Sequence, residues 1–150
     1  MNWQSDTRLY DQNDYYGAFI KDLKTARTRV IIESPFITMR RVNQLAPILE
    51  KLIKRGVTVI INTKPFEEHN PMLYDQVVNA IGKMQDIGIA IYMTVGHHRK
   101  LAIIDESILW EGSLNILSQN DSCEIMRRIE SLEAIKQLLK FINLDRIYER

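Results

Sequence analysis

The chain has 150 residues, of which 45% are hydrophobic and 26% charged, so we expect residues 1–150 to form a single globular domain. Its 20 basic and 19 acidic side chains leave a net charge of +1, which excludes a global positive field as the means of binding a polyanion. No apolar run approaches the ~20 residues of a membrane helix, and the polar N-terminus lacks the basic start and apolar centre of a signal peptide.

Helices and strands are predicted to alternate in the first part of the chain. Helices are expected over residues 14–28, 42–56 and 71–87, and short buried strands over residues 30–33, 57–63 and 89–93. Asn13 is placed to cap the first helix, Pro47 should kink or restart the second, and Gly56 should end it. This alternation indicates a parallel sheet with right-handed crossovers.

The pattern changes in the second part of the chain. Residues 100–104 and 108–112 are two apolar segments only three residues apart, which predicts a β-hairpin. Residues 123–129 are a candidate for a further strand. Residues 131–150 are expected to form an amphipathic helix, whose apolar side carries Leu132, Ile135, Leu138, Leu139 and Ile142. The fold class expected is therefore α/β, with a central mixed, largely parallel sheet.

Polar residues surround this predicted hairpin in the stretch GHHRKLAIIDESILWEGSLN, at residues 96–115. Alternate side chains of a strand share a face, so His98 and Lys100 should point the same way and Arg99 the opposite way. A fixed ammonium beside an imidazole favours the neutral, nucleophilic ring. The pair therefore predicts a nucleophile at His98.

The residues after the second strand of the hairpin complete a candidate phosphate site. Lys100 and the Asn115 amide are suited to hold the non-bridging oxygens of a phosphate, and Ser113 can add a hydroxyl. A turn at Gly112 allows close backbone approach. A neutral nitrogen nucleophile beside such a cradle outlines a phosphoryl-transfer site.

Simpler explanations exist for each residue alone. The stretch HHRK by itself is typical of a solvated basic strand start, and Gly112 to Asn115 by itself is typical of a turn. A zinc site using the three histidines and Cys123 is disfavoured, because no ligand pair has the usual spacing. We expect Cys123 to be a small buried residue and Trp110 to lie in the core. One cysteine excludes an internal disulfide and fits a reducing compartment, so the expected location is cytoplasmic.

The compound motif resembles that of a known family. His98-x-Lys100-x4-Asp105, followed by Gly112-Ser113-x-Asn115, matches the HxKxxxxD…GSxN signature of the phospholipase D superfamily. The resemblance implies an α/β/α sandwich over most of the chain. The stretches RVIIESPFIT and RGVTVIINTKP also resemble the versions of this domain attached to DNA helicases and repair nucleases.

The resemblance also implies roles for the candidate residues. His98 would attack phosphorus and form a covalent phosphohistidine, while Lys100 and Asn115 bind the phosphate and Ser113 supports them. Glu124, nine residues past Asn115, is the candidate that holds the histidine ring, although it could instead pair with Arg127 or Arg128. Asp105 should lie away from the phosphate and be more structural. The family's scheme requires neither a metal nor another cofactor.

A single motif copy has a consequence for assembly. In the family a second histidine protonates the leaving oxygen, and neither His69 nor His97 begins another HxK. The family's small nucleases place their active site on the two-fold axis of a dimer, so an active form of this chain should be a homodimer. No stable membrane association is expected.

The expected activity is a metal-independent phosphodiesterase, most plausibly a nuclease acting on single-stranded or duplex DNA, or on RNA. A phospholipid phosphodiesterase, a lipid-synthesis phosphotransferase and a non-catalytic nucleic-acid-binding or dimerisation module of a helicase-like protein are the alternatives. Basic residues are expected to gather near the site and to help bind the substrate: Arg99, Lys100, Arg127 and Arg128, flanked by Arg40 and Arg41.

Overall fold

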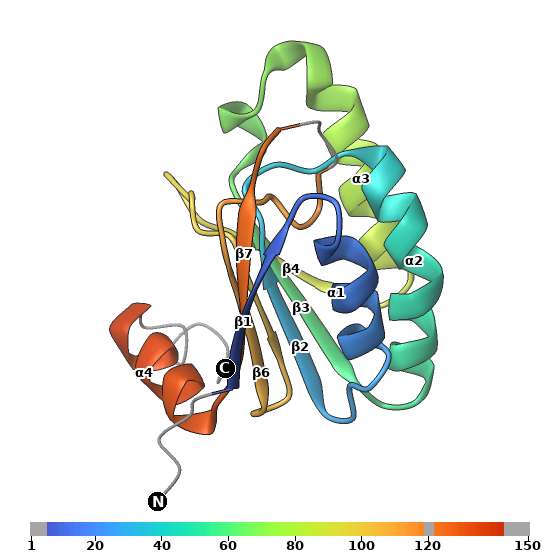
Figure 1. Cartoon of the computed structure of the whole chain (residues 1–150). Coiled ribbons are helices and arrows are strands. Elements are labelled where there is room, and N and C mark those ends of the chain that lie inside the picture. Colours follow the sequence, from blue (N-terminus) through green and yellow to red (C-terminus); the bar gives the residue numbers. More distant parts are fainter. Residues whose placement is uncertain (1–5, 119–121, 143–150) are drawn as a thin grey trace, which may run out of the picture.

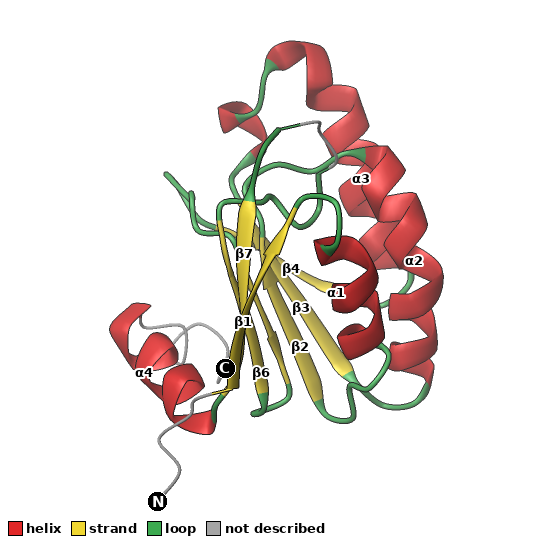
Figure 2. Ribbon diagram, viewed as in Figure 1, coloured by secondary structure: helices red, strands yellow, loops and turns green. Residues whose placement is uncertain are grey.

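Figure 1 shows the computed structural model of the chain, which describes residues 6–118 and 122–142. The strands are β1 (Asp6–Asp11), β2 (Arg29–Glu33), β3 (Thr58–Thr63), β4 (Ala90–Met93), β5 (Leu101–Ile104), β6 (Ile108–Gly112) and β7 (Ile125–Glu130). The α-helices are α1 (Tyr15–Leu23), α2 (Met39–Lys54), α3 (Tyr74–Asp86) and α4 (Leu132–Ile142), with short 3-10 helices η1 (Phe66–Glu68) and η2 (Pro71–Leu73). Helices α1, α2 and α3 cover one face of the sheet and α4 covers the other, which confirms the α/β/α sandwich (Figure 2).

The seven strands form one mixed sheet in the order β1-β7-β6-β5-β2-β3-β4. Parallel pairing is confined to β2 with β3 and β3 with β4, and the other four neighbouring pairs are antiparallel. The sheet is therefore mixed as expected, but it is less parallel than the sequence alternation indicates. The reason is that the hairpin and β7 extend the sheet with antiparallel strands, and β1 adds one more at the edge.

Strand β1 was not anticipated from the sequence. All of its residues except Tyr10 are exposed, so the segment shows none of the apolar alternation that marks a half-buried strand. It is an edge strand paired along its whole length with β7, from Asp6 opposite Glu130 to Asp11 opposite Ile125. Backbone pairing, which a sequence pattern does not reveal, holds it in place.

Several helix boundaries differ from the predicted ones, and α3 begins at Tyr74 after the short helix η2 instead of at residue 71. Helix α1 begins at Tyr15 after Asp14, so Asn13 is not its cap, and the helix ends at Leu23, before residues 24–28. Helix α2 begins earlier than predicted, where the Thr38 hydroxyl accepts the Arg41 N–H, and it continues through Pro47 without a restart. Pro47 is exposed, while the buried face of α2 is apolar, so packing holds the helix across the proline.

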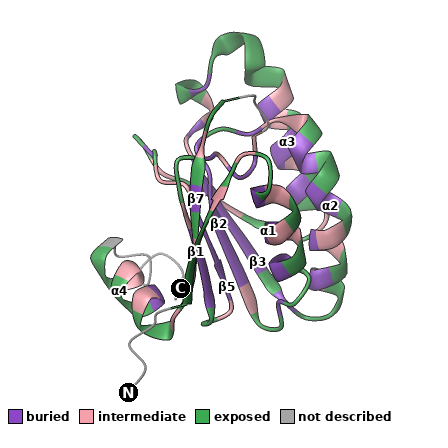
Figure 3. Ribbon diagram, viewed as in Figure 1, coloured by how far each residue is buried: buried purple, intermediate pink, exposed green. Residues whose placement is uncertain are grey.

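The apolar core has a large and a small part (Figure 3). The large part lies between the sheet and α1 to α3, and it includes Trp110, which is fully buried as expected. The small part packs Ile31, Ile103 and Leu109 of the sheet against Ile135 of α4. Cys123 is exposed, so the expectation of a buried cysteine is wrong: it precedes β7 and lies outside both clusters.

The topology brings several polar chain segments to one edge of the sheet, the edge at which β2, β3 and β6 end and β5 begins. Strand β2 is antiparallel to β5, so Glu33 at the end of β2 lies opposite Leu101 at the start of β5. Strand β6 is antiparallel to β5, which places Glu111 and Gly112 at the same edge. The end of β3 joins this edge, because Ser34 N–H donates to the carbonyl of Asn62. No helix within the described residues is long and apolar enough to cross a membrane.

Candidate active site

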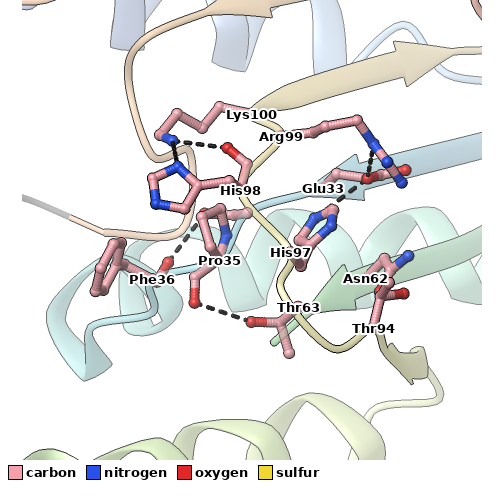
Figure 4. A network of polar contacts seen from close by, with 11 residues as sticks. Glu33, Pro35, Phe36, Asn62, Thr63, Thr94, His97, His98, Arg99 and Lys100 are labelled. Atoms are coloured by element: carbon pink, nitrogen blue, oxygen red, sulfur yellow. Dashed lines mark hydrogen bonds and ion pairs between the residues drawn. The ribbon is translucent and has the colours of Figure 1, made fainter. Parts of the chain in front are cut away.

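His98 and Lys100 lie together at this edge, just before β5 (Figure 4). The Lys100 ammonium donates to the His98 carbonyl oxygen at 2.7 Å and lies 3.3 Å from the His98 ring nitrogen Nδ1. Because an ammonium has only donors, Nδ1 is the acceptor in this contact. The His98 side chain is exposed, so a substrate can reach it.

Gly112 and Ser113 connect this edge to β7. A methyl group on Gly112 would lie 2.1 Å from the carbonyl oxygen of Ile125, so only glycine fits between the strands here. The Ser113 N–H donates to the Ile125 carbonyl at 2.9 Å, and the Ile125 N–H donates to the Ser113 hydroxyl at 3.0 Å. Ser113 therefore secures the start of β7, which agrees with a supporting role.

Asn115 lies in the loop that follows. The loop is fixed from both sides, since the Leu117 N–H donates to the Ser34 hydroxyl and the Thr38 N–H donates to the Leu117 carbonyl. The Asn115 side-chain oxygen Oδ1 is buried and has no hydrogen-bond partner within the described residues. Oδ1 is an acceptor, so the phosphate-binding role expected of Asn115 falls to the donor of its side chain, the amide nitrogen Nδ2.

The residues on either side of His98 point the other way. His97 Nε2 lies 3.1 Å from Glu33 Oε1, and Arg99 Nε donates to the same oxygen at 3.0 Å. Burial, assisted by the nearby charges of Arg99 and Lys100 and by His98, lowers the pKa of His97 to about 4. The alternation places Arg99 opposite His98 and Lys100, as expected, but no role was predicted for His97.

Asp105 lies at the other end of β5, away from His98. Its carboxylate accepts the backbone N–H groups of Arg27, Thr28 and Arg29 and the Thr28 hydroxyl. Burial raises its pKa, but these hydrogen bonds outweigh that effect, so the pKa of Asp105 lies below its ordinary value. The structure thus separates Asp105 from the other motif residues and ties it to the loop before β2.

Glu124 lies just before β7. Its backbone N–H donates to the Gln12 side chain at 2.9 Å, and the side chain is half-buried. Among the described residues, no hydrogen bond or ion pair joins the Glu124 carboxylate to His98, Arg127 or Arg128. Its role at the histidine ring therefore stays a prediction.

Only part of the expected basic cluster faces the site. Arg128 is engaged by Asp22 and Glu130, and Arg41 is buried with its guanidinium 3.8 Å from the Tyr16 ring centre. These two residues do not belong to the cluster, because packing on the α1 side of the sheet holds both of them.

Three of the expected basic residues line a groove of about 640 Å³, and Arg40 is not among its lining residues. Lys100, Arg99 and Arg127 supply its basic groups, and Ile125 and Phe141 are exposed apolar residues in its wall. The groove is therefore a basic and apolar surface on the α4 side of the sheet, and neither His98 nor Asn115 is among the residues that line it. No group of three or more His, Cys, Asp or Glu side chains in the described parts of the chain is arranged to hold a metal ion.

Comparison with known proteins identifies the family. A sequence profile of the family described as "Cardiolipin synthase, PLD-like domain" matches residues 19–145. No curated protein matches the sequence. The solved structure of NucT from Helicobacter pylori has 21% identity and a TM-score of 0.74, over 92% of this chain and 93% of that one. Nuc from Salmonella typhimurium, a phospholipase D family member, has 16% identity and a TM-score of 0.73, over 92% and 91%.

A third similar structure is only partly covered. TrmBL2, an archaeal chromatin protein that binds DNA, has 13% identity and a TM-score of 0.63, over 95% of this chain and 52% of its own. At such identities the structures show the fold alone. The fold and the His98–Lys100 site define a domain of the phosphodiesterase type. By the match of its sequence over residues 19–145, the chain belongs to the phospholipase D superfamily.

Proposed function

We propose that the chain is a metal-independent nuclease that cleaves DNA or RNA through a phosphohistidine, in a site shared by two subunits. The observation that carries this proposal is the exposed His98 ring beside Lys100, at the edge where the Asn115 loop also lies. The similar folds of NucT and Nuc support it. In this proposal residues 1–150 act as one domain, located in the cytoplasm.

In the mechanism, substrate binding rearranges the pair formed by His98 and Lys100. A phosphate is a stronger partner for the ammonium than a neutral ring nitrogen, so Lys100 turns from Nδ1 to the phosphate. Nδ1 can then carry the ring proton and donate a hydrogen bond to a carboxylate. We propose that Glu124 supplies this carboxylate. The Nε2 lone pair becomes free to attack phosphorus, with Lys100 and Asn115 holding the non-bridging oxygens.

The leaving group needs a proton from the opposite side. The P–O bond breaks in line with the attack, and His98 of a second subunit donates its proton to the departing oxygen. The same imidazole then removes a proton from water, which attacks the phosphohistidine and releases the phosphate product. One site therefore uses two copies of His98, Lys100 and Asn115, and we expect the interface around it to bury more than ~1,000 Å².

A nuclease assay with excess chelator tests the activity. Purified protein is incubated with single-stranded and duplex oligonucleotides and EDTA, beside His98→Ala. Cleavage by the wild type alone is the expected result. Cleavage that EDTA abolishes would contradict a metal-independent reaction, and binding without cleavage would favour the alternative of a nucleic-acid-binding and dimerisation module.

Sedimentation equilibrium tests the shared site. The active species should have twice the chain mass of 17.6 kDa. A heterodimer with one His98→Ala subunit should lose most of its single site's activity, because that site needs both histidines. Full activity in a 17.6 kDa monomer would contradict the shared site.

A phospholipid phosphodiesterase is the second candidate, and the groove at Lys100 favours it. The wall of this groove exposes Ile125 and Phe141. Those apolar side chains fit an acyl chain, whereas Arg127 in the same groove fits a second phosphate. Release of headgroup from phosphatidylglycerol or phosphatidylethanolamine vesicles, with no cleavage of oligonucleotides, would replace the nuclease proposal.

A further inference from the structure

Glu33 is a fully buried carboxylate at the end of β2, opposite Leu101 at the start of β5. Its Oε1 accepts a hydrogen bond from Arg99 Nε at 3.0 Å, and His97 Nε2 lies 3.1 Å from the same oxygen. A buried charge is costly unless it is paired and hydrogen-bonded, so these contacts are strongly preferred once the sheet has formed. Both partners are immediate chain neighbours of His98.

The backbone at His98 needs such contacts because the sheet does not hold it. Strand β5 begins only at Leu101, and just before it the Lys100 carbonyl accepts the Gly112 N–H of β6 at 3.3 Å. The preceding turn is fixed at Gly96, whose N–H donates to the Glu68 carboxylate at 2.9 Å. Between Gly96 and Leu101, the side chains that tie the segment to the sheet are His97 and Arg99.

Because successive side chains in this segment alternate in direction, anchoring residues 97 and 99 also sets the direction of the His98 side chain. With the side chains of residues 97 and 99 turned inward to one oxygen atom, the side chain of residue 98 must point outward. Figure 4 shows His97 and Arg99 converging on Glu33 while His98 and Lys100 lie on the opposite side. The carboxylate therefore fixes which way the imidazole faces without touching it.

We infer that Glu33 is a positioning residue, which holds His98 in its reactive orientation through His97 and Arg99. The inference rests on the proposed function, in which His98 is the nucleophile. Reacting groups tolerate little misplacement, and an error of about 1 Å can cost on the order of 100-fold in rate. Removing the Glu33 charge should therefore lower kcat on the order of 100-fold while KM changes little, because Lys100 and Asn115 still bind the phosphate.

The test compares Glu33→Gln with a matched control. Asp22→Asn also removes the charge of a buried carboxylate bound to an arginine. That arginine is Arg128, which is distant from His98 in the sequence and is not a neighbour of it in the segment that Glu33 anchors. Both variants should lose stability. Only Glu33→Gln should lower kcat, and an equal kcat loss in Asp22→Asn would overturn the inference.

A second readout does not depend on activity. Backbone 15N relaxation of His98 should report an order parameter near ~0.85 in the wild type and below ~0.6 in Glu33→Gln. Arg99→Ala removes one of the two contacts at a half-exposed position, and it decides the matter if Glu33→Gln fails to fold. An unchanged order parameter in the folded variants would overturn the positioning role.

The two readouts keep the two proposals separate. A wild type that cleaves no phosphodiester, together with a falling order parameter in the variants, would refute the proposed function and leave the positioning of residue 98 intact. Normal cleavage with a rigid His98 in every variant would refute the positioning alone.

Discussion

The two ends of β5 carry the two halves of one sequence motif and are built in opposite ways. At the start of the strand, His98 is exposed with the Lys100 ammonium beside its ring, and Asn115 lies in the adjoining loop. At the end of the strand, Asp105 accepts hydrogen bonds from three backbone N–H groups and a hydroxyl. One end keeps its polar groups available, and the other end uses all of them.

This difference separates reactivity from stability within the motif. Groups with spare hydrogen-bonding capacity can bind a phosphate, whereas a carboxylate with saturated partners contributes to folding. Asp105 also adopts a positive φ of 55° in the turn between β5 and β6, a conformation that Asp tolerates better than most residues. The motif residues at the start of β5 therefore serve the chemistry, and Asp105 at its end serves the stability of the fold.

The largest effect is expected for His98→Ala. Cleavage should fall by on the order of 10⁴-fold or more, because one substitution removes both the nucleophile and the acid of the shared site. The melting temperature should stay the same, since the side chain is exposed. Single-turnover rates and thermal melts check this, and more than a tenth of the wild-type rate would rule out the mechanism.

Acid titration should distinguish the two ends by the pH at which each loses stability. The pKa of His97 is about 4 in the folded protein against an ordinary 6.5, so the unfolded chain binds the proton first as pH falls. Stability from neutral His97 is complete above pH 6.5 and is lost between pH 6.5 and 4, by up to about 3 kcal/mol. Asp105, with its pKa below 3.8, loses its contribution only at lower pH.

Urea unfolding between pH 7.5 and 4.5 measures the first of these windows. His97→Gln is the matched variant, and its stability should vary less with pH than that of the wild type. Burial lowers the pKa of His69 as well, so the difference between the two proteins isolates His97. Parallel pH curves for both proteins would contradict a neutral, buried His97.

Asp105→Ala should affect stability and spare the chemistry. Loss of the carboxylate leaves the donors of Arg27, Thr28 and Arg29 without their acceptor, which should cost about 2 kcal/mol. Asp105→Asn keeps an acceptor and tolerates the positive φ, so its loss should be smaller. Denaturant unfolding and cleavage rates check both. A rate loss comparable with that of His98→Ala, at unchanged stability, would place Asp105 in the chemistry.

The smallest effect is expected for Arg127→Ala. Comparing it with Arg128→Ala tests whether an arginine without an ion-pair partner among the described residues and one bound to a carboxylate differ in binding nucleic acid. Arg127 lines the groove, so its loss should reduce the slope of log affinity against log salt for a single-stranded oligonucleotide by about 1. Arg128, the adjacent residue, is bound to Asp22, so Arg128→Ala should lower stability and leave the salt slope unchanged. Equal slopes in the two variants would place the nucleic acid elsewhere.

Much of the site could be predicted from the sequence, because its chemistry depends on residue types at fixed spacing. The hairpin pattern placed His98 and Lys100 at the start of one strand and Gly112, Ser113 and Asn115 at the end of the next. Short-range periodicity is enough for that, since a hairpin brings the two segments together without any other element. The α/β alternation and the buried Trp110 were likewise local patterns that the structure confirms.

Tertiary structure decided what depends on distant segments. Glu33 meets His97 and Arg99 only because β5 pairs with β2 across 66 residues of chain, and no local pattern encodes that pairing. Arg128 and Arg127 have the same residue type and adjacent positions, yet the sheet turns one to Asp22 and the other to the groove. Strand β1 exists through backbone hydrogen bonds to β7, which are independent of side-chain pattern. Residue types thus determined the chemistry, and strand pairing determined which groups are held in place and which remain available.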